Sequence, residues 1–283
     1  MRLLAIADGT EHVMAVCRAD GGTAIPLQTV ADFYADLDRG LALAGERLAT
    51  ASDTDAIDIG QATLVPFVPV TARIFCLGLN YGRHAQEAGK SVAFIPEIFG
   101  RWHNTLVANG ALVPVPPREP GLDWEGEFAV VVGRPLYDAG VGEASGAFLG
   151  YTCFLDLSAR TYQRATRHVT LGKNADHSGP IGPVLVTVGE FAGDGGLHLQ
   201  TRVNGQVMQD ASTAEMIFSP AEIASYISGV TRLLPGDVIA TGTPAGVGIT
   251  RDPPVYLTPG DDVEVEIEKI GVLRASICGP SKG

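Results

Sequence analysis

The chain has 283 residues, of which 46% are hydrophobic and 18% charged, a balance that excludes general disorder and allows a substantial core. Its 32 acidic and 20 basic side chains give a net charge of −12, and no Lys/Arg cluster could neutralise phosphates, so no nucleic acid partner is expected. No apolar run reaches eighteen residues, and the first residues lack a signal-peptide pattern, so we expect no membrane partner and a cytoplasmic location. The 35 glycines and 18 prolines indicate many turns and short strands, hence a mainly β protein.

Residues 1–68 predict a small N-terminal domain of α/β type. Apolar patterning predicts strands over 3–7 and 12–17 and a helix over 30–51. The prolines in 65–70 favour an extended linker or edge, so we place the boundary there and assign 69–283 to a second domain. The four cysteines are scattered without metal-binding spacing, which favours buried thiols in a reducing compartment.

A short apolar segment, 73–77, predicts a buried strand, and His84 and Glu87 follow it. On a helical turn this spacing places imidazole and carboxylate on one face, where the carboxylate orients the ring and raises its basicity. The pair is a candidate for activating water. The alternative is a His/Glu pair on an exposed surface turn.

Three acidic residues flank two predicted buried strands. Glu125 and Glu127 point to the same face if Glu125 opens the strand over 127–132, and Asp156 ends the strand predicted over 146–155. Carboxylates this close repel unless a proton or a hard divalent cation lies between them. The alternative is a solvated strand face, which is what Glu264 and Glu266 predict in the strictly alternating stretch 263–268. The run after Glu127 is apolar on both faces, which weakens that alternative.

Polar residues follow Asp156 at helix-like intervals. Arg160, Gln163 and Arg167 are spaced by three and four residues, and Lys173 follows; a lysine near carboxylates either binds an anionic substrate or acts as a counter-charge. Arg101 lies in an aromatic-rich segment, 96–105, that either lines a cleft or crosses the surface.

The C-terminal third contains three strong local signals. Asn204-Gly205 between 197–203 and 206–210 predicts a β-hairpin. Ser219, Pro220 and Glu222 predict the start of a helix over 220–229, with Ile223, Tyr226, Ile227 and Val230 on its packed face. A strand over 238–240 leads into the glycine-rich loop 241–248, which lacks the Lys-Ser/Thr of a phosphate-binding loop; we expect it to let backbone approach a ligand.

Four blocks of residues resemble the fumarylacetoacetate hydrolase family over roughly 73–277. They are Asn80-Tyr-x-x-His84-x-x-Glu87, Asp123-x-Glu125-x-Glu127, Asp156-x-Ser158-Ala159-Arg160-x-x-Gln163 and Pro235-Gly-Asp-x-x-x-Thr-Gly-Thr-Pro244. The resemblance implies an α+β, mainly β fold with a mixed β-roll catalytic domain, commonly as a homodimer. It also implies Mg²⁺ or Mn²⁺ held by Glu125, Glu127 and Asp156.

The same resemblance implies roles around the metal. His84 and Glu87 would activate water, and Gln163, Lys173 and Thr243 would surround the substrate, with Arg101 in the place of a common lysine. Leu79 stands where many members carry an arginine, and Leu155 where many carry a small polar residue. These departures leave open which group binds the far end of the substrate. The segments 101–106 and 172–180 look more like the bacterial isomerase, decarboxylase and acylpyruvate hydrolase branch.

The expected function is metal-dependent hydrolysis of a carbon–carbon bond in a 2,4-dioxo acid, which is a small anionic 2-oxo acid. Cleavage would release an enolate as the leaving group, stabilised by the metal ion and by Lys173. The alternative is an isomerase or decarboxylase of a related 2-oxo or 2-hydroxydienoate acid. A non-catalytic relict of the fold is a third hypothesis, motivated by Leu79 and Leu155.

Overall fold

A computed structural model describes residues 1–91, 94–191 and 196–280 of the chain, and the strands within these ranges belong to two sheets. The strands of the larger sheet are β1 (Arg2–Asp8), β2 (Glu11–Cys17), β3 (Thr23–Thr29), β4 (Ile57–Asp58), β5 (Leu64–Val65), β6 (Ile74–Gly78), β7 (Glu97–Arg101), β8 (Leu106–Val107), β10 (Gly126–Val132), β11 (Phe148–Leu155), β12 (Gly179–Thr187) and β15 (Val238–Ala240). The strands of the smaller sheet are β9 (Ala111–Pro114), β13 (His198–Val203), β14 (Gln206–Ser212), β16 (Asp262–Ile267) and β17 (Gly271–Cys278). The expected mainly β fold is confirmed.

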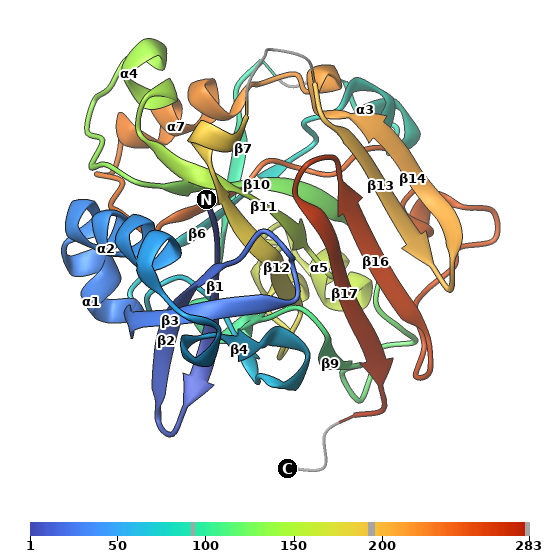
Figure 1. Ribbon diagram of the computed structural model, residues 1–283. Helices are drawn as coiled ribbons and strands as arrows, with labels where there is room; N and C mark the ends of the chain where they lie inside the picture. Colours follow the sequence, from blue (N-terminus) through green and yellow to red (C-terminus); the bar gives the residue numbers. More distant parts are fainter. Residues whose placement is uncertain (92–93, 192–195, 281–283) are drawn as a thin grey trace.

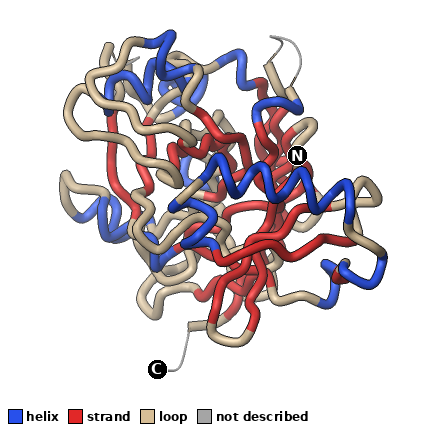
Figure 2. Tube along the Cα trace, turned by 60° about the vertical axis from the view of Figure 1, so that its left-hand side comes forward, coloured by secondary structure: helices blue, strands red, loops and turns tan. Residues whose placement is uncertain are grey.

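The helices are short and lie around the sheets (Figure 1). They are α1 (Val30–Ala35), α2 (Leu37–Thr50), α3 (Gly82–Glu87), α4 (Val141–Ser145), α5 (Arg160–Ala165), α6 (Thr170–Lys173) and α7 (Pro220–Ser228). Single 3₁₀ turns are η1 (Asp53–Asp55), η2 (Ile59–Gln61), η3 (His103–Thr105), η4 (Val188–Glu190), η5 (Thr213–Glu215) and η6 (Gly248–Thr250). The longest, α2, lies in front of the strands in Figure 2 and contacts β2 and β3.

The centre of the larger sheet is built from strands with apolar side chains on both faces. Every residue of β10 is buried, and β10 pairs antiparallel with β11 and with β15, which pairs in parallel with β6. A strand covered on both faces reads as a continuous apolar run, as the sequence 128–132 does. This arrangement places the residues just before β10, just after β11 and just after β15 in one region of the fold.

The smaller sheet packs against β10 through a glycine. A Cβ atom on Gly126 would lie 2.0 Å from Thr201 Oγ1 and 2.9 Å from Val265 Cγ2, so only glycine permits this approach of β13 and β16. Val263, Val265 and Ile267 of β16 are buried while Glu264 and Glu266 are partly exposed, which confirms the predicted alternation. Glu264 and Glu266 pair with Arg274 and Arg202, each at 2.7 Å.

The N-terminal strands continue the larger sheet. β1 pairs antiparallel with β12, with Leu3 opposite Leu185, and one apolar cluster contains residues from both sides of the predicted boundary at 68, among them Met14, Phe33, Val131 and Phe154. The boundary itself stays a prediction.

Two helix predictions are corrected in part by the structure. The predicted helix over 30–51 is two helices, because Asp36 leaves helical geometry and its carboxylate accepts a hydrogen bond from Arg39 N, which caps α2. α7 begins with the predicted Ser219–Glu222 capping box, but its packed face consists of Ile223, Ala224, Ile227 and Ser228. Tyr226 and Val230 are 45% and 84% exposed, so their predicted place on the packed face was wrong.

Candidate active site

Three carboxylates converge where β10 begins and β11 ends. Glu125 precedes β10, Glu127 lies within it, and Asp156 follows β11, whose pairing places Gly126 opposite Leu155. The amide of Asp156 donates to the carbonyl of Glu125 at 2.9 Å, which brings the two side chains together. One oxygen from each of the three carboxylates lies within 4.8 Å of the others, and all three residues are buried. The structure therefore places the predicted acidic cluster in one site.

Two of these carboxylates are paired with buried cations. Lys173 Nζ contacts Glu125 Oε2 and lies 2.6 Å from Asp156 Oδ2, and Arg160 Nη2 lies 2.6 Å from Glu125 Oε1. Burial alone would raise the pKa of Glu125, but Lys173 and Arg160 outweigh it and lower this pKa to about 2. Burial would likewise lower the pKa of Lys173, but Asp156 and Glu125 raise it. Glu125 and Lys173 are therefore both charged near neutral pH.

Glu127 has a different environment. Its Oε2 accepts a hydrogen bond from Gly242 N at 2.8 Å, and within the described residues no basic side chain pairs with it. Burial, and then the neighbouring Asp156 and Glu125, raise the pKa of Glu127 well above its ordinary value. A negative charge on Glu127 thus has no ion-pair partner among the described residues, and Lys173 and Gly242 N offset it only in part.

Arg101 lies behind Asp156. Its side chain is fully buried, its Nε and Nη2 donate to Asp156 Oδ1, and its Nη1 lies 2.6 Å from Ser178 Oγ. Arg101 is a counter-ion of Asp156 in this structure, and its expected contact with substrate stays a prediction.

His84 and Glu87 lie on α3, as the spacing predicts. His84 Nδ1 is 3.4 Å from Glu87 Oε2, His84 is 8% exposed, and Glu87 also accepts a hydrogen bond from Gly246 N at 3.0 Å. Gly246 has a φ of +106°, and a Cβ there would lie 2.2 Å from Met208 O. The glycine-rich loop after β15 thus lets backbone approach the pair, and it holds Glu87 in position.

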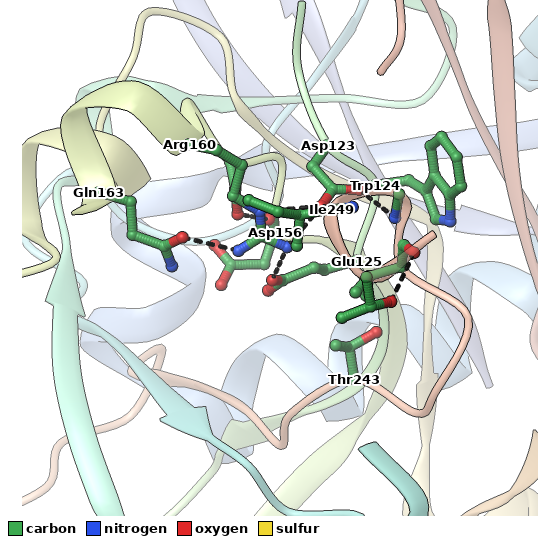
Figure 3. A network of polar contacts seen from close by, with 12 residues as sticks. Asp123, Trp124, Glu125, Asp156, Arg160, Gln163, Thr243 and Ile249 are labelled. Carbon is green, nitrogen blue, oxygen red and sulfur yellow. Dashed lines mark hydrogen bonds and ion pairs between the residues drawn. The ribbon is translucent and has the colours of Figure 1, made fainter. Parts of the chain in front are cut away.

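Thr243 and Gln163 are placed on the walls of the site. Thr243 Oγ1 donates to Gly126 O at 2.9 Å and accepts from Gln209 Nε2 at 2.7 Å. Gln163 Oε1 accepts from Arg160 Nη1 at 2.7 Å, and Figure 3 shows the two side chains pointing toward one another.

The sequence did not assign roles to Asp123 and Arg160. Asp123 is fully buried and accepts hydrogen bonds from Gly248 N, Ile249 N and Arg160 Nε, at 2.6, 2.9 and 2.8 Å (Figure 3). Arg160 therefore bridges Asp123 and Glu125, and it joins the glycine-rich loop to the acidic cluster. The available signal was Asp123 itself, a third carboxylate at the same period of two as Glu125 and Glu127.

Part of this site borders a pocket of about 1070 Å³, whose lining does not include Glu127, Asp156 or Arg101. Of the predicted site residues, the ones that line it are His84, Glu87, Glu125, Gln163, Lys173 and Thr243. The remaining wall includes Leu79, Phe99, Arg160 and the segment between α5 and α6. The pocket thus contains a His/carboxylate pair and a buried ammonium group beside a carboxylate cluster, which is suited to proton transfer on a small anion.

No helix within residues 1–91, 94–191 and 196–280 is long and apolar enough to cross a membrane.

The fold and site define a mainly β protein with a buried carboxylate cluster where the central strands β10 and β11 begin and end. Residues 73–278 match the fumarylacetoacetate (FAA) hydrolase C-terminal family, so the chain belongs to this family, as its motifs predict. It is 37% identical over 239 residues to oxaloacetate tautomerase Fahd2a, mitochondrial, from Rattus norvegicus, covering 84% of this chain and 76% of the relative.

Solved structures agree with the sequence comparison. A candidate HpcE protein from Mycobacterium smegmatis has a TM-score of 0.87 at 30% identity, covering 99% of this chain and 100% of the other. The 2-hydroxyhepta-2,4-diene-1,7-dioate isomerase from Mycobacterium marinum has a TM-score of 0.77 at 31% identity and full coverage of both chains (100% each). The chain is thus an enzyme of this superfamily, and the activities named for these relatives favour the isomerase alternative over the hydrolysis expected first.

Proposed function

We propose that this chain is a proton-transferring isomerase that interconverts the keto and enol forms of a small anionic 2-oxo acid. The observation that carries the proposal is the His84–Glu87 pair in the wall of the same pocket as Lys173 and Glu125. The tautomerase and isomerase named among the relatives support this reaction class. The reaction moves one proton between C3 and the oxygen at C2, so it consumes no water and breaks no carbon–carbon bond.

His84 is the group we assign to the proton at C3. When its Nδ1–H donates to Glu87, Nε2 carries the lone pair and accepts that proton. Glu87 fixes this tautomer and stabilises the imidazolium that forms, while Gly246 N keeps Glu87 in place. The reverse reaction returns the proton from Nε2 to C3.

Lys173 is the group we assign to the oxygen at C2, where negative charge develops. An ammonium group has three N–H donors, and two of those of Lys173 are directed at Glu125 and Asp156. The third is left for the substrate, because Lys173 also lines the pocket. The two carboxylates hold the ammonium group in place, so little reorganisation is needed during the reaction.

The acidic cluster fits Mg²⁺ or Mn²⁺. Its three carboxylates are hard oxygen donors in one place, and the negative charge of Glu127 has no basic side chain against it in the described residues. The ion pairs to Glu125 and Asp156 leave lone pairs on these oxygens, since a carboxylate has about four acceptor sites. Glu125, Glu127 and Asp156 would hold the ion, which when bound supplies a Lewis acid that polarises the carboxylate and 2-oxo oxygens of the substrate.

Hydrolysis of a 2,4-dioxo acid is the second candidate, supported by the reaction in the family's name. In that reaction the His84–Glu87 pair would deprotonate a water that attacks the carbonyl at C4. The C3–C4 bond then breaks, and the electron pair and a proton pass to C3. The same residues serve both reactions, so the product distinguishes them.

The test is turnover of oxaloacetate and of a 2,4-dioxo acid, followed by the absorbance of the enol and by product mass. We expect unchanged mass; gain of one water would establish hydrolysis instead, and loss of carbon dioxide would establish decarboxylation. His84→Ala should lower the rate by about 10²- to 10⁴-fold without changing metal affinity.

The matched control is His198→Ala. His198 forms a similar pair with Asp210, at 2.7 Å, but both side chains are 55% exposed and lie outside this pocket. Activity should therefore be unchanged. Full activity of His84→Ala would remove the dyad from the mechanism.

A further inference from the structure

The outer wall of the pocket carries basic side chains that the proposed chemistry does not use. Arg164, Arg167 and His168, at the end of α5 and in the segment before α6, all line the pocket, and Lys90 lines it from the segment after α3. Within the part of the chain that the structure describes, the guanidinium groups of Arg164 and Arg167 form neither an ion pair nor a hydrogen bond.

The inner cations differ, because they are already neutralised. Arg160 is bound to Asp123 and Glu125, and Lys173 to Glu125 and Asp156. The acidic residues of the wall beyond this cluster are Glu87, which is held by His84 and Gly246, and Glu97. The outer wall of the pocket therefore carries unpaired positive charge, although the net charge of the chain is −12.

The backbone that carries these arginines is held at both ends. Thr161 N and Tyr162 N donate to the carboxylate of Glu119, at 3.4 and 3.2 Å, at the start of α5. Gly172 of α6 lies against α5, since a Cβ there would be 2.4 Å from Gln163 Cα.

The intervening turn is closed by Thr166. Its Oγ1 donates to His168 O at 2.9 Å and accepts from His168 N at 3.2 Å. Together with the two anchored ends, this turn fixes the positions from which both arginines face the pocket.

We propose that Arg164 and Arg167 form a subsite for a second carboxylate of the substrate, so that the enzyme prefers 2-oxo dicarboxylates to 2-oxo monocarboxylates. This rests on the proposed function, in which Lys173 takes the 2-oxo end. A guanidinium group presents paired N–H donors that match the two oxygens of a carboxylate, and pairing an unpaired cation with a carboxylate adds a charge-assisted hydrogen bond. His168 adds a further ring N–H donor at the same position.

The experiment compares substrates that differ only in the second carboxylate. Oxaloacetate is matched with 2-oxobutanoate, and 2-oxoglutarate with 2-oxopentanoate; the series is extended to the six- and seven-carbon 2-oxo diacids to find the preferred length. Keto–enol exchange is followed by loss of the C3 protons to deuterated solvent. We expect Arg164→Ala and Arg167→Ala each to raise KM for the best diacid about tenfold, since a hydrogen bond to a charged group contributes about that factor, with kcat nearly unchanged.

The controls separate this subsite from general effects of charge. KM for the monocarboxylates should not change in either variant. Arg39→Ala removes an exposed arginine of α2 that does not line the pocket, and it should leave KM unchanged for both substrate classes. Arg167→Lys should restore part of the preference because it keeps the charge and loses the paired donors.

Two outcomes are distinguishable failures. In the first, the wild-type protein exchanges C3 protons, but the arginine variants either keep the wild-type KM for every diacid or raise KM equally for monocarboxylates and dicarboxylates. The subsite is then refuted and the proposed function stands. If the wild type exchanges no substrate of either class, the proposed function fails. Binding of 2-oxoglutarate against 2-oxopentanoate, measured by calorimetry, then decides the subsite alone; equal affinities for the two refute it.

Discussion

Two stretches of this chain have the same pattern of glutamates and opposite environments. Glu125-Gly-Glu127 leads into β10, where both glutamates are buried, and Glu264-Val-Glu266 lies in β16, where both are partly exposed. In β16 each glutamate pairs with an arginine of a neighbouring strand, half-buried Arg202 or exposed Arg274, and the intervening valine is buried. At β10 the intervening residue is a glycine against the smaller sheet, and the glutamates face buried lysine, arginine and aspartate. The alternating pattern predicts that both glutamates lie on one face of the strand. Whether that face is buried or exposed to solvent depends on what packs against it.

The largest expected difference between the two stretches is in activity. Glu127→Gln should lower turnover by about 10²-fold or more, because it removes a carboxylate from the only buried acidic cluster found in the described residues. Glu266→Gln should leave turnover unchanged, since Glu266 pairs with Arg202 at the surface. Steady-state rates of both variants check this; equal effects would mean that the two stretches are alike and that the cluster is misassigned.

The second expected difference is in stabilisation by a metal ion. A ligand that binds only the folded state adds about 2.7 kcal/mol at 100 times its dissociation constant, so Mn²⁺ or Mg²⁺ should raise the melting temperature of wild type and of Glu266→Gln. Glu127→Gln should show a smaller rise. Without metal, however, it should be no less stable than wild type, because burial and the neighbouring Asp156 and Glu125 already disfavour a negative charge on Glu127, which raises its pKa.

The measurement is a thermal melt with and without EDTA, together with calorimetric titration of the metal. A wild-type melting temperature that is independent of Mn²⁺ would refute the metal site without reference to activity.

The sequence predicts what short-range patterns determine. The Asn204-Gly205 hairpin, the cap of α7 and the strands β1, β2, β6 and β15 follow from residues a few positions apart. The family motifs supply the grouping of Glu125, Glu127 and Asp156, which are 2 and 29 positions apart and meet only because β10 pairs with β11.

Long-range pairing accounts for most of what sequence reasoning missed. Nothing near Leu3 indicates that β1 joins β12 and thereby extends the larger sheet. Likewise, the sequence does not decide whether Arg101 lines a cleft or lies on the surface. Its burial depends on a hydrogen bond to Asp156, 55 positions away. The break between α1 and α2 does not depend on long-range pairing. Asp36 is a local helix-capping signal from which the break could have been predicted.

The smallest expected effect concerns the middle residue of each stretch. Gly126→Ala places a methyl group 2.0 Å from Thr201 Oγ1, and overpacking of this kind costs about 1–3 kcal/mol. Val265→Ala should cost a similar amount for the opposite reason, because it leaves a cavity where Val265 is fully buried. Both are measured as free energies of unfolding in urea, without metal.

Thr201 separates these two mechanisms. Its Oγ1 is buried and has no hydrogen-bond partner in the described structure, so Thr201→Ala removes the clashing atom without breaking a hydrogen bond. Gly126→Ala should therefore cost less in the Thr201→Ala background than in wild type, whereas Val265→Ala should not gain from it, since removing a second group enlarges the cavity. A double-mutant cycle measures this coupling. If the cost of Gly126→Ala is the same in both backgrounds, the contact with β13 is not the reason that a glycine separates the two buried glutamates.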